Sequence, residues 1–161
     1  MFKPLRKLLN ALPVLGAANG ATLRVTPEEL AQARRAHREW HMNLVACLTG
    51  HSNEVLHPEE LCFDDRCVFG QWLQTTGEAR LGHEGFAALN RHHKMVHLHA
   101  ANVVSFRLAG QLVKARTLFK TGYADSSRAL MTTIDELEAQ CASRPILMRR
   151  RVRQSEAPAT T

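Results

Sequence analysis

The chain has 161 residues, of which 45% are hydrophobic and 22% charged, and its formal net charge is +6. This is the size of one domain with one core; no run approaches the 18 apolar residues of a membrane span, and four cysteines are too few for a disulfide scaffold. Residues 1–27 and 144–161 each carry a charge of +4, which leaves residues 28–143 at −2. The positive charge therefore belongs to the ends, and it does not indicate a nucleic-acid-binding surface on the folded middle.

The first segment, "MFKPLRKLLNALPVLGAANGA", has the basic start, apolar stretch and small residues of a signal peptide. Asn10 and Pro13 interrupt the apolar stretch, which favours a basic amphipathic or flexible tail that could contact a membrane surface. We expect a basic N-terminal segment over residues 1–26, a helical domain over 27–143 and a basic, disordered tail over 144–161. A cytoplasmic location is expected.

The first predicted helix begins after Thr26. The motif "TPEE" offers a capping residue, a proline at the first helical position and a T-x-x-E capping box with Glu29. Apolar residues then recur every three or four positions up to Cys47, which predicts a helix that faces the core. Gly50 is a natural end for this helix.

A connecting region with one short helical turn is expected over residues 51–66. Asp64 or Asp65 could then cap a short helix that carries Cys67 and ends at Gly77.

Two further helical patterns follow. One runs from about His83 to Leu108, Gly110 interrupts the pattern, and the last one covers residues 112–137. No β-type alternation competes with these patterns. The predicted fold is all-α, a four-helix-bundle-like domain in which one short helix carries Cys67.

Two of the nine histidines have the spacing of a metal-binding pair. His93 and His97 are four residues apart on the apolar stripe of their predicted helix. Side chains at this spacing lie one above the other, so two imidazoles can close on one ion. Two buried imidazoles also need a shared reason for being desolvated. The pair is therefore a candidate metal site, with two hydrogen-bonded core histidines as the alternative.

His37 and Cys67 are the candidates to complete this site. His37 lies on the core stripe of the first helix, although a lone inward histidine is more often a hydrogen-bonded core residue, and His41 lies only at the stripe edge. Cys67 is expected at a helix start, where backbone N–H groups lower the pKa of a thiol; Cys62 competes from a less regular segment. Three imidazoles and one thiolate form a closed tetrahedral set suited to one Zn²⁺ per chain.

Three segments, in this order, resemble the chemoreceptor zinc-binding (CZB) domain of bacterial signalling proteins. They are "AHREW", "CVFGQWL" and "HKMVHLHAANVV", and the later "AGQLVKARTLFKTGYADSSRALMTTIDEL" is similar to the closing helices of that family. The similarity covers roughly residues 30–140. The family binds zinc through three histidines and one cysteine, which map by motif onto His37, Cys67, His93 and His97.

The resemblance implies a zinc-binding regulatory or sensory protein that is not an enzyme. It implies a homodimer and a signalling partner from a chemoreceptor (chemotaxis) or cyclic-di-GMP system. Oxidation of Cys67 would remove a ligand and could make the site responsive to thiol redox state. The chain shows neither the methyl-accepting coiled coil nor the cyclase domain that family members usually regulate, so the output is left open.

Three other classes remain open on sequence. A zinc enzyme would need an open coordination position, which arises only if Cys67 does not bind. A di-iron site normally needs bridging carboxylates, and we find no inward acid paired with His93 and His97. The main alternative is a structural-zinc scaffold whose basic ends contact a membrane, an acidic partner or, least expected, nucleic acid.

Overall fold

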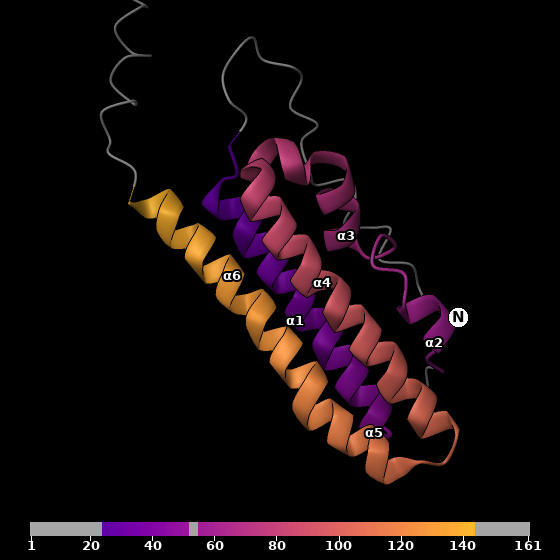
Figure 1. Ribbon diagram of the computed structural model, residues 1–161. Helices are drawn as coiled ribbons and strands as arrows, with labels where there is room; N and C mark the ends of the chain where they lie inside the picture. The colour runs from indigo at the N-terminus through magenta and orange to yellow at the C-terminus, as the bar shows by residue number, and fades with distance from the viewer. Residues whose placement is uncertain (1–23, 52–54, 144–161) are drawn as a thin grey trace, which may run out of the picture.

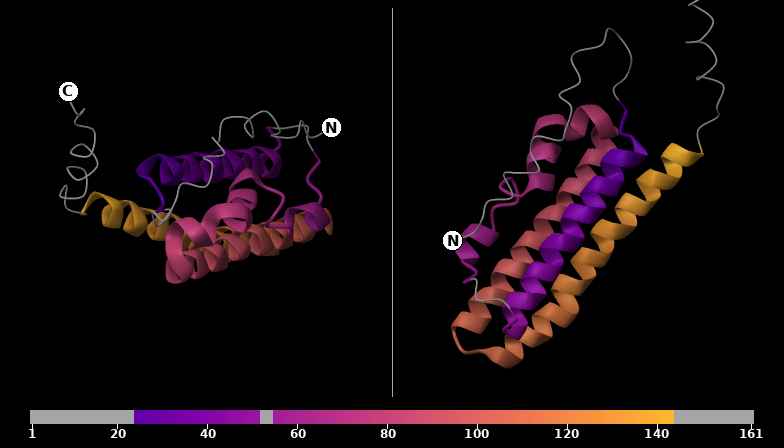
Figure 2. Two further views of the ribbon diagram at one scale, coloured as in Figure 1. Left: turned by 90° about the horizontal axis from the view of Figure 1, so that it is seen from above. Right: turned by 180° about the vertical axis from the view of Figure 1, so that it is seen from behind.

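Three long helices run side by side in the computed structural model, which describes residues 24–51 and 55–143 (Figure 1; right-hand view of Figure 2). They are α1 (Pro27–Thr49), α4 (Glu78–Leu108) and α6 (Ala124–Ala142). The helix α5 (Leu112–Leu118) and the π-helical segment η4 (Phe119–Tyr123) lead into α6 without a break.

A shorter helical arm packs beside α4. It consists of α3 (Val68–Trp72) and the π-helical segment η3 (Leu73–Gly77), and the single-turn helix α2 (Pro58–Leu61) also lies against α4 (Figure 1). No strand occurs in the described ranges. The prediction of an all-α, four-helix-bundle-like fold is confirmed. Basic segments were expected over residues 1–26 and 144–161, and of these, residues 1–23 and 144–161 lie outside the described residues.

Both predicted ends of α1 are confirmed. The Thr26 hydroxyl accepts from the Glu29 N–H, and the Glu29 carboxylate accepts from the Thr26 N–H at 2.8 Å, which completes the capping box. Gly50 ends the helix in the left-handed conformation, with φ 79°. This conformation favours glycine because it has no Cβ.

The core follows the predicted stripes of α1, α4 and α6. Its fully buried side chains include Leu30 from α1, Leu89 from α4 and Leu130 and Ile134 from α6. Each such side chain contributes about 2–3 kcal/mol through removal of apolar surface from water. Three histidines are buried in the same stripes: His37, His93 and His97.

Two sequence expectations about the short helix are wrong. The helix does not end at Gly77; it continues through η3 into α4, and the chain turns at Gly82, where φ is 74° and ψ 167°. Neither Asp64 nor Asp65 caps α3, because Cys67 is itself the capping residue. The sulfur of Cys67 accepts a hydrogen bond from the Gly70 N–H at 3.1 Å.

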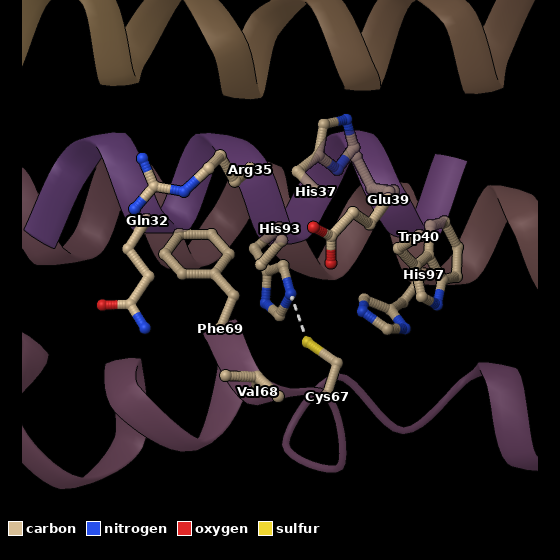
Figure 3. A pocket seen from close by; sticks show the side chains of 12 residues that line it. Gln32, Arg35, His37, Glu39, Trp40, Cys67, Val68, Phe69, His93 and His97 are labelled. Carbon is tan, nitrogen blue, oxygen red and sulfur yellow. Dashed lines mark hydrogen bonds between the residues drawn. The ribbon is translucent and has the colours of Figure 1, made fainter. Parts of the chain in front are cut away.

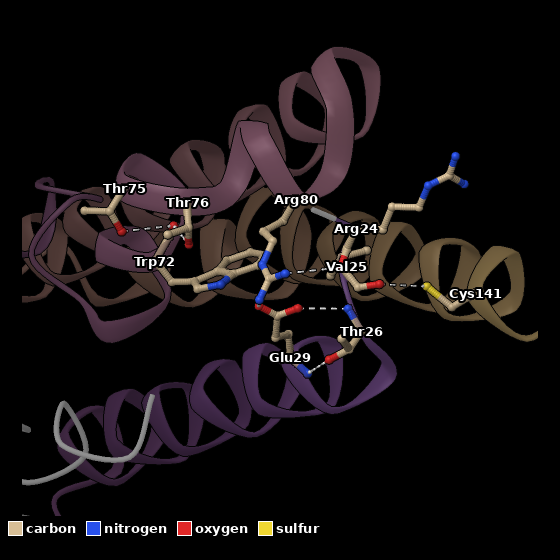
Figure 4. A network of polar contacts seen from close by, with 9 residues as sticks. All are labelled: Arg24, Val25, Thr26, Glu29, Trp72, Thr75, Thr76, Arg80 and Cys141. Atoms are coloured by element: carbon tan, nitrogen blue, oxygen red, sulfur yellow. Dashed lines mark hydrogen bonds and ion pairs between the residues drawn. The ribbon is translucent and has the colours of Figure 1, made fainter. Parts of the chain in front are cut away.

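A polar network ties the first residues of the domain to α4 and α6 (Figure 4). The Arg80 guanidinium pairs with the Glu29 carboxylate at 3.0 Å, and the Val25 N–H donates to the Arg80 carbonyl at 2.8 Å. The Cys141 thiol contacts the Val25 carbonyl at 3.6 Å. The start of α1 is thereby held against both long helices, which places His37, about three turns farther along α1, at a fixed height in the bundle.

Candidate metal centre

The thiol of Cys67 and the imidazole of His93 meet where the start of α3 approaches α4. The Cys67 sulfur lies 3.2 Å from His93 Nε2, as the dashed line in Figure 3 marks. Cys67 stands at the start of α3 and His93 in the middle of α4, so packing of the short arm on α4 creates this contact.

His97 completes a cluster of three side chains. Its ring centroid lies 4.7 Å from that of His93, one helical turn away, and the rings are inclined at 76°. Ligand atoms of Cys67, His93 and His97 all lie within 4.8 Å of one another. His97 Nδ1 lies 2.8 Å from the carbonyl oxygen of Leu61, to which it donates as an N–H, and this leaves Nε2 as the nitrogen with a free lone pair.

His37 lies at the same cavity but does not join the cluster. Its Nε2 is hydrogen-bonded to the Ser127 hydroxyl of α6 at 2.8 Å, and its ring points away from the Cys67 sulfur (Figure 3). A cavity of about 100 Å³ is lined by all four residues that the sequence singled out. The structure thus brings three of them together and leaves the fourth on the cavity wall.

The other candidates from the sequence lie outside the cluster. His41 Nδ1 is hydrogen-bonded to the Tyr123 hydroxyl at 2.8 Å. Cys62 is exposed, and its thiol donates to the Glu59 carbonyl at 3.2 Å.

Aromatic side chains surround the cluster. Trp40 lies 4.9 Å from the His97 ring, and Phe69 meets the His93 ring edge-on at 4.8 Å. Trp72 stacks on Phe69 at 5.9 Å. Such a shell excludes water and lowers the local dielectric, which strengthens the interaction of ligand atoms with a cation.

Burial keeps the cluster neutral. It lowers the pKa of His93 to about 3 and that of His37 to about 4, and it also lowers the pKa of His97, because a buried imidazolium loses its hydration. Burial raises the pKa of the Cys67 thiol to about 11, which outweighs the opposite effect of the Gly70 N–H. The expectation that the helix start lowers this pKa is therefore wrong for the protein alone; a bound dication would lower it.

The glycine of "CVFG" has a steric reason. A Cβ at Gly70 would lie 1.7 Å from the Asp64 carbonyl oxygen and 3.1 Å from His93 Cε1. Only glycine lets the loop before Cys67 fold back over the start of α3.

These residues fit a zinc ion. A tetrahedral zinc with Zn–S of about 2.3 Å and Zn–N of about 2.0–2.1 Å separates its sulfur and nitrogen ligands by about 3.6 Å, close to the 3.2 Å between Cys67 and His93. Two imidazoles and one thiol also form a borderline-soft donor set that suits zinc rather than magnesium or calcium.

The fold is an all-α bundle, and its cluster of Cys67, His93 and His97 could hold a metal ion. Residues 37–104 match the family model of the chemoreceptor zinc-binding domain, and they belong to that family. The match begins at His37 and includes Cys67, His93 and His97. The family is a regulatory zinc-binding family of chemoreceptor-type signalling and not a catalytic one. No curated protein and no solved structure matches the chain.

Two polar residues at the site were not predicted. Ser127 is hydrogen-bonded to the His37 ring. Asp64, which the sequence suggested only as a helix cap, places a carboxylate oxygen 4.0 Å from His93 Nδ1. The sequence showed no inward acid paired with His93 and His97, and Asp64 was not recognised as a neighbour of His93 because it lies in a loop rather than on a helix stripe. Among the described helices, none is long and apolar enough to cross a membrane.

Proposed function

We propose that this chain is a zinc-binding regulatory module in which His37, Cys67, His93 and His97 hold one Zn²⁺. The observation that carries the proposal is the convergence of the half-buried Cys67 with the buried His93 and His97, at a cavity that His37 also lines. Three neutral imidazoles and a thiolate give zinc a closed tetrahedral shell without a position for substrate, which favours sensing or structure over catalysis.

The ligands come from parts of the chain that are far apart in sequence. His37 belongs to α1, Cys67 to the start of α3, and the histidine pair to α4. Binding by all four would join these elements through one ion. The free energy of zinc binding would then stabilise the packing of the bundle.

His37 supplies a route from the site to α6. Its Nε2 cannot both ligate zinc and keep its hydrogen bond to Ser127, so ligation through this atom requires the two side chains to separate. The contact between α1 and α6 at this point would then differ between protein with and without zinc. A ligand shifts such an equilibrium only through its different affinity for the two arrangements.

The proposal extends to the biological setting. We propose a zinc-binding domain over residues 27–143, within a cytoplasmic homodimer that signals to a partner of a chemoreceptor or cyclic-di-GMP system. What supports this setting is the family match at residues 37–104. Thiol oxidation of Cys67 would remove one ligand and release zinc, which would make the module responsive to redox state as well.

The test is a zinc titration of the purified full chain against a chromophoric chelator, beside Cys67→Ser and His97→Ala. One reversible equivalent in the wild type, with affinity lost in both variants, is the expected result. Cys62→Ser is the matched control, because this exposed cysteine lies five residues away and outside the cluster. It should bind like the wild type.

Hydrogen exchange separates a sensing site from a structural one. A sensing site predicts that amide exchange of α6 near Ser127 changes with zinc in a reversible way. Zinc that leaves only when the chain unfolds would point instead to the structural-zinc scaffold, and no zinc binding at all would refute both.

A further inference from the structure

The loop before α3 places a carboxylate beside the outer nitrogen of His93. Asp64 Oδ2 lies 4.0 Å from His93 Nδ1. Both atoms are buried and have no hydrogen-bond partner among the described residues, and the His93 side chain is only 3% exposed. Buried polar atoms in native proteins are almost always paired. Two unpaired atoms that face each other therefore point to an interaction that tightens when the site is in use.

His97 shows in the same site what such a partner does. Its Nδ1–H donates to the Leu61 carbonyl oxygen at 2.8 Å, which fixes the tautomer and presents the Nε2 lone pair to the cluster. His93 also presents Nε2, to the Cys67 sulfur, so its Nδ1 must carry the proton whenever Nε2 binds a metal. That proton needs an acceptor equivalent to the Leu61 carbonyl.

The local backbone holds Asp64 where this acceptor is required. The Asp64 carbonyl oxygen lies so close to the start of α3 that a Cβ at residue 70 would overlap it. Its carbonyl also contacts the Cys67 sulfur at 3.7 Å. Asp64 is thus tied to the same turn that positions the thiol, and closing the gap to His93 from 4.0 Å to a hydrogen bond of about 2.8 Å needs only a small movement of the side chain.

We propose that Asp64 is a positioning residue of the metal centre, whose carboxylate accepts a hydrogen bond from His93 Nδ1–H when His93 Nε2 ligates the ion. This rests on the proposed zinc site. The carboxylate orients the ring, selects the tautomer and makes Nε2 a stronger donor to the cation. It also places a negative charge near a site whose ligands, apart from the thiolate, are neutral.

The test compares zinc affinity of the full-length wild type, Asp64→Ala and Asp64→Asn with that of the control Asp65→Asn. Asp65 is the adjacent exposed acid, so its variant removes the same charge without touching His93. Asp64→Ala should weaken zinc binding by about 10- to 100-fold, the usual effect of losing such a partner. Asp64→Asn, which keeps the shape and a weaker acceptor, should lose less, and Asp65→Asn should stay within about twofold of the wild type.

A spectroscopic readout distinguishes positioning from mere destabilisation. In ¹H–¹⁵N spectra of the histidine rings, the zinc-bound wild type should show His93 with Nδ1–H protected from solvent exchange. Asp64→Ala should lose that protection while His97, held by its backbone carbonyl, keeps its own. Unchanged affinity and an unchanged His93 signal in both Asp64 variants would overturn the inference while leaving the zinc site intact. An equal loss in Asp65→Asn would also overturn it, and a wild type that binds no zinc would remove the proposed function itself.

Discussion

Because His37 is hydrogen-bonded to Ser127, removal of the Ser127 hydroxyl should raise the affinity of the protein for zinc. If His37 ligates zinc through Nε2, the Ser127 hydroxyl at 2.8 Å is a competitor of the metal. A hydrogen bond of this kind contributes about 0.5–1.5 kcal/mol net. Ser127→Ala should therefore tighten zinc binding by about 2- to 12-fold, since about 1.4 kcal/mol corresponds to a factor of ten.

The assay is competition with a chelator of known zinc affinity, at pH 7.5 and fixed ionic strength. Ser126→Ala is the control, because the neighbouring hydroxyl contacts His99 and the Tyr123 carbonyl rather than the site. In a His37→Ala background, Ser127→Ala should have no further effect, because the competition no longer exists. Equal or weaker binding by Ser127→Ala in the wild-type background would refute ligation by His37 Nε2 at the expense of this bond.

Three further predictions concern glycine sterics, acid stability and proton release. Gly70→Ala should abolish zinc binding and lower the melting temperature, because the new Cβ would overlap a loop carbonyl. The control Gly85→Ala, whose Cβ would meet side chains at 3.4 Å, should bind zinc normally. A Gly70→Ala protein that binds zinc like the wild type would contradict the close approach of the loop to residue 70. In a chelator-containing buffer, His37 alone should lower the unfolding free energy by about 2 kcal/mol between pH 7.5 and 5. The pKa of His37 is about 4 in the folded protein and 6.5 in the unfolded chain. The unfolded chain therefore takes up the proton first as the pH falls. Urea titrations at the two pH values measure this, and His37→Leu should show a smaller loss. Calorimetry in buffers of different ionisation enthalpy should find about one proton released per zinc at pH 7.5. Cys67, with a pKa of about 11, is protonated before zinc binds, whereas the imidazoles are already neutral. Release of no proton would exclude ligation by the Cys67 thiolate.

The helices could be predicted because their signals are local. The capping box at Thr26, the left-handed end at Gly50 and the apolar stripes of α1 and α4 depend on residues within a few positions of one another. Gly77 was wrongly predicted to end the short helix. A glycine does not by itself end a helix, and here a π-helical turn continues through Gly77 into α4. The turn required a positive φ, and the chain reached it five residues later, at Gly82.

The site could be predicted only as far as spacing and burial allow. The i,i+4 pair His93 and His97 is visible in the sequence, and both side chains are buried as predicted. The contacts of His37 and Asp64 depend on how α6 and a loop pack against the cluster, which no local pattern encodes. The raised pKa of Cys67 has the same origin, because burial by distant residues outweighs the local effect of the helix start.

The most direct test of the proposed centre is zinc-edge X-ray absorption spectroscopy of the zinc-loaded full chain. Four-coordinate zinc with one sulfur at about 2.3 Å and three nitrogens at about 2.0–2.1 Å is the predicted result, and Cys67→Ser should lose the sulfur scatterer. A shell with no sulfur, or with two, would contradict the assignment of His37, Cys67, His93 and His97 as the ligands of one zinc ion.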